Sequence, residues 1–258
     1  MGDDAVAAME QVATWVHDAQ RVVVLTGAGI STDSGIPDFR GPNGVWTRNP
    51  AAEKASSIEY YLNDREVRVA AWQSRLEHSA WTAQPNDGHR AIVALERSGR
   101  LHALITQNID ELHQRAGNDP SRVVEVHGTV WWTRCWDCGD RRPMAEALDR
   151  VRDGDADPAC GVCGGILKSD TISFGQSLVP DVIDRAFSVS AECDLFVAIG
   201  STLSVFPVAN CVPTARQAGA RVVIVNGEET AMDGHADVVL RGSISAILPT
   251  ILSPSGNT

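Results

Sequence analysis

The sequence predicts an α/β fold, a Rossmann-like doubly wound parallel sheet of about six strands, and two observations support it. Six short runs are almost continuously apolar, as parallel strands covered on both faces are. Segments with a helical period stand between most of them, which indicates parallel βαβ units. The predicted strands span residues 21–27, 101–108, 122–128, 195–201, 220–226 and 236–242, and the clearest helices span 88–99, 179–190 and 208–219.

Two stretches interrupt this alternation. Residues 42–86 hold three of the seven tryptophans and a predicted helix over 57–76, without a strand signal, and residues 129–170 hold two C-x-x-C pairs. We expect 42–86 as a helical insert and 129–170 as a metal-binding module to build a smaller domain. Residues 1–41, 87–128 and 171–258 then form the larger domain. Ligands of open α/β sheets bind beyond the carboxyl ends of the strands, so the cleft between the two domains is the expected site.

The bulk composition is that of a soluble globular protein. Of 258 residues, 43% are apolar and 21% are charged. No apolar stretch approaches the roughly 18 residues of a membrane helix, and the acidic N-terminus, which reads as an amphipathic helix, lacks the basic start of a signal peptide. A net charge of −11 argues against nucleic-acid binding and suits cationic partners such as lysine-rich segments. We expect a cytoplasmic protein with no membrane association, and the sequence leaves the oligomeric state open.

Four of the six cysteines have the spacing of a zinc site. Cys135, Cys138, Cys160 and Cys163 form C-x2-C-x21-C-x2-C. Two such pairs complete a tetrahedral four-thiolate site without an open position, which predicts one structural zinc ion. The alternative is four ordinary buried or redox-active thiols. Cys193 and Cys211 lie in core-like segments and are expected to be packing residues.

The loop after the first predicted strand begins like a dinucleotide-binding loop. Gly27 and Gly29 supply G-x-G, but Thr32 stands where a third glycine is expected. The glycines form either a tight strand-to-helix turn or a loop that holds a dinucleotide in another way. A dehydrogenase would also have an acidic residue about 20 positions further on, and Lys54 and Ala55 stand there instead, with Glu53 alone in a polar loop.

Polar and small residues follow four other predicted strands. A lone histidine at a strand end, such as His127, is more often structural than catalytic. Here it shares one rim of the sheet with amide, carboxylate and hydroxyl groups, which favours a catalytic role. The other members of this rim are Gln107, Asn108 and Asp110, then Gly200, Ser201 and Thr202, then Asn226, Gly227 and Glu228.

Taken together, these motifs resemble the sirtuins, NAD-dependent protein lysine deacylases. The motifs are GAGISTDSGIPDFRG, TQNID, HG, the paired C-x-x-C, GSTLSV and VN, in this order. The resemblance covers roughly residues 15–245. It implies that nicotinamide leaves NAD, that the acyl group of an acyl-lysine protein substrate moves to ADP-ribose, and that the zinc ion is structural.

The resemblance also implies roles for individual residues. His127 is implied as the general base, and Asn108 as a catalytic residue in the nicotinamide pocket. Phe174, Gly175 and Val205 are implied to lie where the substrate peptide pairs as a strand with both domains. The implied NAD-binding residues are Gly27, Ala28, Gly29, Asp38, Phe39, Arg40, Gln107, Asn108, Ile109, Asp110, Gly200, Ser201, Thr202, Asn226, Gly227, Glu228 and Ile244.

Two departures from the family pattern concern specificity. Gln176 replaces the glutamate of Phe-Gly-Glu, which puts peptide preference in question. Members that prefer succinyl-lysine carry Tyr-x-x-Arg, and here Tyr61 is followed by Asp64 at the arginine position, although Arg65 is adjacent. We therefore expect acetyl-lysine, or a longer neutral acyl group, to be preferred over succinyl-lysine.

Three other functions remain open at this point. The loop form is closest to a subgroup to which long-chain deacylation with weak deacetylation, or protein mono-ADP-ribosyl transfer, is also attributed. The third alternative is a zinc-bearing NAD sensor or scaffold without catalysis. A scaffold would have no need of His127 between a ribose pocket and a peptide cleft.

Overall fold

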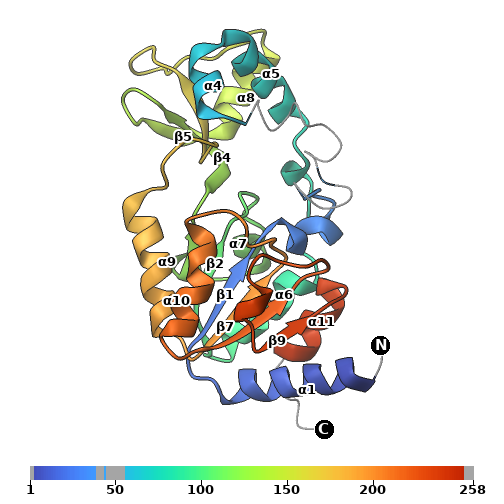
Figure 1. The fold of residues 1–258 in the computed structure, drawn as a ribbon. Coiled ribbons are helices and arrows are strands. Elements are labelled where there is room, and N and C mark those ends of the chain that lie inside the picture. Colours follow the sequence, from blue (N-terminus) through green and yellow to red (C-terminus); the bar gives the residue numbers. More distant parts are fainter. Residues whose placement is uncertain (1–2, 39–43, 45–55, 253–258) are drawn as a thin grey trace.

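The computed structural model describes residues 3–38, 44 and 56–252. Its larger body contains a six-stranded, all-parallel sheet in the order β3-β2-β1-β7-β8-β9 (Figure 1). Counted along the chain, this order is 3-2-1-4-5-6, that of the Rossmann fold. The prediction of six parallel strands is therefore confirmed. The strands are β1 (Val22–Thr26), β2 (Leu101–Thr106), β3 (Val123–Glu125), β7 (Leu195–Ile199), β8 (Arg221–Val225) and β9 (Val238–Leu240).

Helices cover both faces of this sheet, which explains why its strands are apolar at nearly every position. Val22 and Val24 of β1 pack into one core cluster, and Val23 and Leu25 pack into the other. All five residues of β1 are buried. The first cluster lies under α1 (Asp3–Asp18), α6 (Asp87–Arg97) and α11 (Ile244–Leu252), and the second lies under α9 (Pro180–Glu192) and α10 (Cys211–Gln217).

The smaller body lies above the parallel sheet in Figure 1. It has a core of its own. It combines a three-stranded antiparallel sheet, in the order β5-β4-β6, with three helices. Trp72 and Met144 are almost fully buried in this core. The elements are α4 (Ile58–Asn63), α5 (Arg65–Leu76), β4 (Gly128–Cys135), β5 (Arg141–Pro143), α8 (Met144–Arg152) and β6 (Leu167–Thr171).

The prediction of one continuous helix over residues 57–76 is wrong. The backbone of Asp64 is extended, with φ −123° and ψ 113°, and separates α4 from α5. Its carboxylate accepts a hydrogen bond from the backbone N–H of Glu66 at 2.8 Å. Asp64 is thus the N-cap of α5, and capping is worth about 1 kcal/mol, enough to favour a new helix start over continuation.

Short helical turns complete the fold. They are α7 (Leu112–Ala116) and the 3₁₀ helices η1 (Ala28–Ser34), η2 (Ser79–Trp81), η3 (Pro120–Arg122), η4 (Val208–Asn210) and η5 (Asp233–His235). Within the described residues, no helix has the combination of length and apolar content that a membrane span requires.

The N-terminus of α6 joins this helix to the loop after β1. The side chain of Asn86 accepts hydrogen bonds from the backbone N–H groups of Gly88 and His89, and the backbone N–H of Asn86 donates to His89 Nδ1, which completes a capping box with His89. Its Nδ2 donates to the carbonyl of Ile30 at 2.7 Å and to Ser34 Oγ at 3.0 Å. One amide side chain therefore both starts α6 and holds η1 in place.

Two buried histidines pack beneath this loop. The rings of His89 and His113 lie 4.9 Å apart, and His113 Nε2 is 2.9 Å from Thr26 Oγ1. Neither side chain is more than 1% exposed. Burial lowers the pKa of His89 to about 4 and also lowers the pKa of His113.

These histidines are expected to make the fold sensitive to acid. The unfolded chain takes up a proton at His89 near pH 6.5, whereas the folded protein does so only near pH 4, so the free energy of unfolding falls as the pH drops through this window. The loss assigned to His89 is about 3 kcal/mol. His89→Gln keeps a side chain suited to the capping box and should reduce the pH dependence measured by urea unfolding. His17→Gln, at an exposed site, is the control. If the free energy of unfolding depended on pH equally in both variants, the assignment to His89 would be contradicted.

Candidate functional site

The loop after β1 reaches the end of β7 through close backbone contact. The N–H of Gly29 donates to the carbonyl of Gly200 at 2.8 Å. A Cβ atom on Gly27 would lie 2.7 Å from the Gly200 oxygen, and one on Gly29 would lie 2.8 Å from the Gly200 Cα. Both distances are shorter than real Cβ contacts, so glycine is required at both positions.

The structure also explains why Thr32 replaces the expected third glycine. The segment after Gly27 is a 3₁₀ helix that ends at Gly35, whose φ is 83°. In a dehydrogenase the third glycine lets a long α-helix pack closely against the sheet. Here Thr32 is exposed and its hydroxyl donates to the carbonyl of Gly29 at 3.0 Å. The short η1 therefore needs no glycine at position 32.

One cavity of about 1590 Å³ unites the predicted site. It lies where the loop after β1, the ends of β2, β7 and β8 and the segment from β6 to α9 meet. Phe39 and Arg40 lie outside the described residues. Every other predicted catalytic, NAD-binding and peptide-binding residue lines this cavity, namely Gly27, Ala28, Gly29, Asp38, Gln107, Asn108, Ile109, Asp110, His127, Phe174, Gly175, Gly200, Ser201, Thr202, Val205, Asn226, Gly227, Glu228 and Ile244.

Ser31 is a site residue that the sequence reasoning missed. It is fully buried and its hydroxyl donates to Asp110 Oδ2 at 2.7 Å. Asn108 Nδ2 donates to the Ser31 hydroxyl and to the carbonyl of Gly27, both at 3.2 Å. Burial raises the pKa of Asp110, and hydrogen bonds from Leu112 and Ser31 oppose this shift. The signal in the sequence is the GIS triplet, in which a small polar residue follows the apolar Ile30.

Hydrogen bonds also link the other strand ends. Gln107 Nε2, after β2, donates to Ser201 Oγ, after β7, at 2.8 Å. Asn226 Nδ2, after β8, donates to the carbonyl of Glu228 at 2.8 Å. These bonds hold the polar side chains along the carboxyl edge of the sheet, where the sequence predicted them.

His127 lies in the short connection between β3 and β4. Its Nδ1 is 3.0 Å from the carbonyl of Gln107. A carbonyl can only accept, so Nδ1 carries the hydrogen of the neutral ring and Nε2 has the free lone pair. Burial lowers the pKa of His127, and the hydrogen bond to Gln107 offsets part of this shift. His127 is therefore a neutral base at pH 7, with Nε2 as the basic atom.

Glycine is also required directly after the histidine. Gly128 has a φ of 71°, and a Cβ atom there would lie 2.1 Å from the carbonyl oxygen of Asp170. The backbone N–H of Ile172 donates to the carbonyl of His127 at 2.9 Å. This close approach of β4 and β6 fixes the backbone of His127.

The main chain of Phe174 is not free to pair with a peptide. Its N–H donates to the carbonyl of Ser56 at 3.0 Å, and its carbonyl accepts from Ile58 at 2.9 Å. These bonds form a parallel bridge between residues 57 and 174. Of the residues expected to contact the peptide, Gly175 and Val205 remain the candidates for main-chain pairing.

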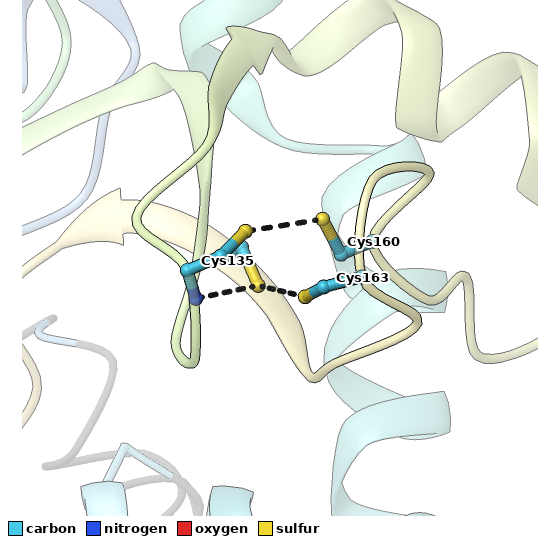
Figure 2. A group of neighbouring side chains, drawn as sticks. Cys135, Cys160 and Cys163 are labelled. Carbon is cyan, nitrogen blue, oxygen red and sulfur yellow. Dashed lines mark hydrogen bonds between the residues drawn. The ribbon is translucent and has the colours of Figure 1, made fainter.

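The four cysteines predicted as metal ligands converge on one point, as Figure 2 shows for Cys135, Cys160 and Cys163. All four sulfur atoms lie within 4.8 Å of one another. Cys135 Sγ lies 3.5 Å from Cys163 Sγ, and Cys138 Sγ lies 3.7 Å from Cys160 Sγ. Tetrahedral zinc with bonds of about 2.3 Å separates its sulfur ligands by about 3.8 Å, so this geometry fits one zinc ion.

The backbone around the cluster also suits thiolate ligands. The N–H groups of Cys138, Val162 and Gly165 donate to the sulfurs of Cys135, Cys160 and Cys163 at 3.4–3.5 Å. Such donors stabilise negative charge on sulfur. The remaining cysteines, Cys193 and Cys211, are buried, and burial raises their pKa values to about 12 and about 11. They are packing residues, as predicted.

Comparison with known proteins agrees with this geometry. The family model described as "Sir2 family" matches residues 27–207. The NAD-dependent protein deacetylase 2 of Streptomyces coelicolor is 47% identical over 91% of this chain and 98% of its own length. The NAD-dependent protein deacetylase 1 of Bradyrhizobium diazoefficiens is 41% identical over 96% of each chain.

Solved structures give the same result for the fold. A Sir2 structure with a deacetylated p53 peptide and 3'-O-acetyl ADP ribose matches with a TM-score of 0.86 and 31% identity, over 94% of this chain and 96% of that one. A Sir2 structure with a p53 peptide and NAD+ matches with a TM-score of 0.83 and 31% identity, over 93% and 95% of the two chains. The chain therefore belongs to the Sir2 family.

Proposed function

We propose that this protein is an NAD-dependent protein lysine deacylase that acts as a deacetylase. One observation carries the proposal. The loop after β1, the polar residues that follow the other strands and a neutral His127 all line one cavity. The relatives from Streptomyces coelicolor and Bradyrhizobium diazoefficiens, both named NAD-dependent protein deacetylases, support it. The products are the free lysine, nicotinamide and O-acyl-ADP-ribose.

The binding of NAD is assigned to the strand ends. NAD supplies an electrophilic ribose carbon when nicotinamide leaves. The phosphates are assigned to the loop after β1, which Gly27, Gly29 and Gly200 allow to pack against the end of β7. Gln107 offers its amide and Ser201 its hydroxyl to a ribose. Asn108, whose Nδ2 is held by Ser31 and Gly27, lines the pocket assigned to the carboxamide.

His127 is assigned as the general base. It accepts a proton at Nε2, because Nδ1 is committed to the carbonyl of Gln107. The same hydrogen bond fixes the orientation of the ring, so the lone pair keeps one direction during the reaction. A base that is neutral at pH 7 and held in place is what proton transfer from a substrate hydroxyl requires.

The acylated protein is assigned to the cleft between the two bodies. Gly175 and Val205 flank it and offer main-chain groups for strand-like pairing, with Phe174 forming part of the wall. We place the boundary between the domains as the sequence suggests, because the described residues in the core cluster of the small body lie within 72–81 and 135–167. Residues 42–86 and 129–170 then form the small domain.

We also assign the protein to the cytoplasm.

Zinc is assigned a structural role. All four ligands are cysteines, which leaves no position for water or substrate, and Cys135 and Cys160 also belong to the core of the small body. The metal then crosslinks two segments of that body and stabilises it, as closed cysteine sites do in other proteins.

Replacing His127 with alanine tests the catalytic assignment. His127→Ala should lower formation of O-acyl-ADP-ribose from an acetyl-lysine peptide by about 100- to 10,000-fold, because proton transfer by a positioned base contributes that factor. Mass spectrometry follows the product, and calorimetry should find NAD affinity within a few-fold of the original. His102→Ala is the control, since His102 lies at the surface beside Glu192. Full turnover by His127→Ala would remove this residue from the base role.

The pH dependence of kcat/KM tests the protonation state of the base. Only neutral His127 accepts a proton, so the rate falls as the pH drops through its pKa. Burial lowers this pKa, so the acid limb should lie below the usual value of about 6.5. Circular dichroism recorded at each assay pH must show the folded protein, which excludes acid unfolding as the cause of the fall. An acid limb centred above pH 7 would contradict the assignment.

Metal content tests the zinc assignment. Elemental analysis should find one zinc ion per chain, and Cys135→Ser should lose it together with the folded small body, because structural zinc contributes on the order of 10 kcal/mol to such modules. Cys193→Ala is the matched control, since this buried cysteine lies outside the cluster and should keep the metal. A folded, active Cys135→Ser protein without zinc would refute the structural role.

A further inference from the structure

Two buried threonines end neighbouring strands at the centre of the parallel sheet. Thr26 is the last residue of β1, Thr106 is the last residue of β2, and the two are partners in the ladder between these strands. They are 0% and 2% exposed, and neither lines the cavity that holds His127. Thr26 Oγ1 donates to Thr106 Oγ1 at 2.9 Å. A buried hydroxyl is costly without hydrogen bonds, so the partners of these two threonines define what they contribute.

The hydroxyl of Thr106 holds the chain where it leaves β2. The backbone N–H of Asn108 donates to Thr106 Oγ1 at 3.1 Å, which is the turn that a threonine hydroxyl makes with the chain two residues further on. The side chain of Asn108 is held as well, because its Nδ2 donates to the carbonyl of Gly27 and the hydroxyl of Ser31. Both the main chain and the side chain of Asn108 are therefore fixed by hydrogen bonds.

His113 of α7 extends these hydrogen bonds on the other side of Thr26. Its Nε2 lies 2.9 Å from Thr26 Oγ1. Because Thr26 gives its hydrogen to Thr106, it accepts at this contact, and His113 Nε2 carries the hydrogen of the ring. His113 Nδ1 has no hydrogen-bond partner within the described residues, so a second hydrogen there would be buried without an acceptor. Burial and the nearby His89 lower the pKa of His113, which keeps the ring neutral at pH 7.

The same histidine also packs against the segment that holds the loop after β1. The rings of His113 and His89 lie 4.9 Å apart. His89 Nδ1 bonds to Asn86, whose Nδ2 donates to the carbonyl of Ile30 at 2.7 Å. His113 therefore lies between two groups of hydrogen bonds, one that ends at the loop after β1 and one that ends at Asn108.

We propose that His113, Thr26 and Thr106 are positioning residues for Asn108. The hydrogen bonds form a chain with one direction: the imidazole N–H donates to the first hydroxyl, that hydroxyl donates to the second, and the second accepts the backbone N–H of Asn108. The inference rests on the proposed deacylase function and adds to it the residues that orient the pocket assigned to nicotinamide. None of the three lines the cavity, so they act on the reaction through Asn108 rather than by touching NAD.

This role differs in its kinetics from a purely structural one. Asn108 is assigned to the pocket that receives the carboxamide, so its position bears on the loss of nicotinamide. A group at a reacting centre must stay within about 0.5 Å of its productive place, and a displacement of about 1 Å can lower the rate about 100-fold. A chain that only stabilised the fold would change the free energy of unfolding and leave kcat as it is.

Thr106→Val tests the link that touches Asn108. It removes the hydroxyl and keeps the branched shape, and kcat for nicotinamide release from NAD with an acetyl-lysine peptide should fall by about 10- to 100-fold, with KM for the peptide unchanged. Thr106→Ser keeps the hydroxyl and should retain most of kcat. Thr26→Val breaks the chain one link further from Asn108 and should lower kcat by a smaller factor.

Thr133→Val is the matched control, because it makes the same substitution at a buried strand residue. Thr133 is 1% exposed and lies outside the cavity, and its hydroxyl donates to the carbonyl of Arg142 at 3.2 Å. Thermal unfolding shows which variants are folded, and Thr26→Val carries the kinetic test if Thr106→Val is not. The proposal is overturned if folded Thr106→Val keeps the original kcat, if Thr133→Val loses as much, or if Thr106→Ser is no faster than Thr106→Val.

Two NMR measurements test the chain without any turnover. The backbone amide hydrogen of Asn108 should exchange with solvent faster in Thr106→Val than in the unchanged protein and in Thr106→Ser, and equal exchange in all three would contradict the chain. In the unchanged protein, the ring nitrogens of His113 should show a neutral ring with its hydrogen on Nε2, whereas a hydrogen on Nδ1 would contradict it. Absence of nicotinamide release from the unchanged protein with every acyl-lysine peptide would instead reject the proposed function, and these measurements would then decide on the chain.

Discussion

The close contact between the loop after β1 and the end of β7 is the constraint on which the site depends. Gly27 and Gly29 touch Gly200, and the N–H of Gly27 donates to the carbonyl of Ile199 at 2.9 Å. β1 pairs with β2 on one side and with β7 on the other. The strand order therefore runs outward from β1 in opposite directions, through β2 to β3 and through β7 to β9. A crevice opens at such a switch point. The absence of side chains at the three glycines lets the loop after β1 pack against the end of β7 at this crevice.

Much of the fold and site could be predicted because their determinants are local. A strand covered on both faces must be apolar at every position, and this marked all six strands of the parallel sheet. The carboxyl ends of parallel strands meet at one edge, so polar residues after separate strands, such as Asn108 and Asn226, were expected to share a cavity. The doubled spacing of Cys135 to Cys163 defines a tetrahedral ligand set without reference to the rest of the chain.

Other features could not be predicted because they depend on contacts between distant segments. In the antiparallel strands of the small body, apolar and polar residues do not alternate regularly, and glycines and charged residues stand among them. Neither a strand period nor a helix period is therefore visible in residues 129–170. Arg75 becomes a cleft residue through a contact with Ser169 of β6, 94 positions away in the sequence. The break at Asp64 arises because two local signals compete. The apolar pattern of residues 57–76 favours one continuous helix, but the Asp64 carboxylate caps a new helix start, and the cap prevails.

The position of His127 explains why a structural metal belongs in this enzyme fold. The segment from β3 to β4 passes from the parallel sheet into the small body, with His127 between them and Cys135 at its far end. The ladder between β4 and β6 holds Gly128 against Asp170, while Cys135 and Cys160 anchor the same body through the metal site. Loss of the metal would free the far end of β4, and the ladder that fixes the backbone of His127 would lose its support. The four-cysteine site thus leaves no position for a substrate, yet it supports the strand that follows His127, the proposed base.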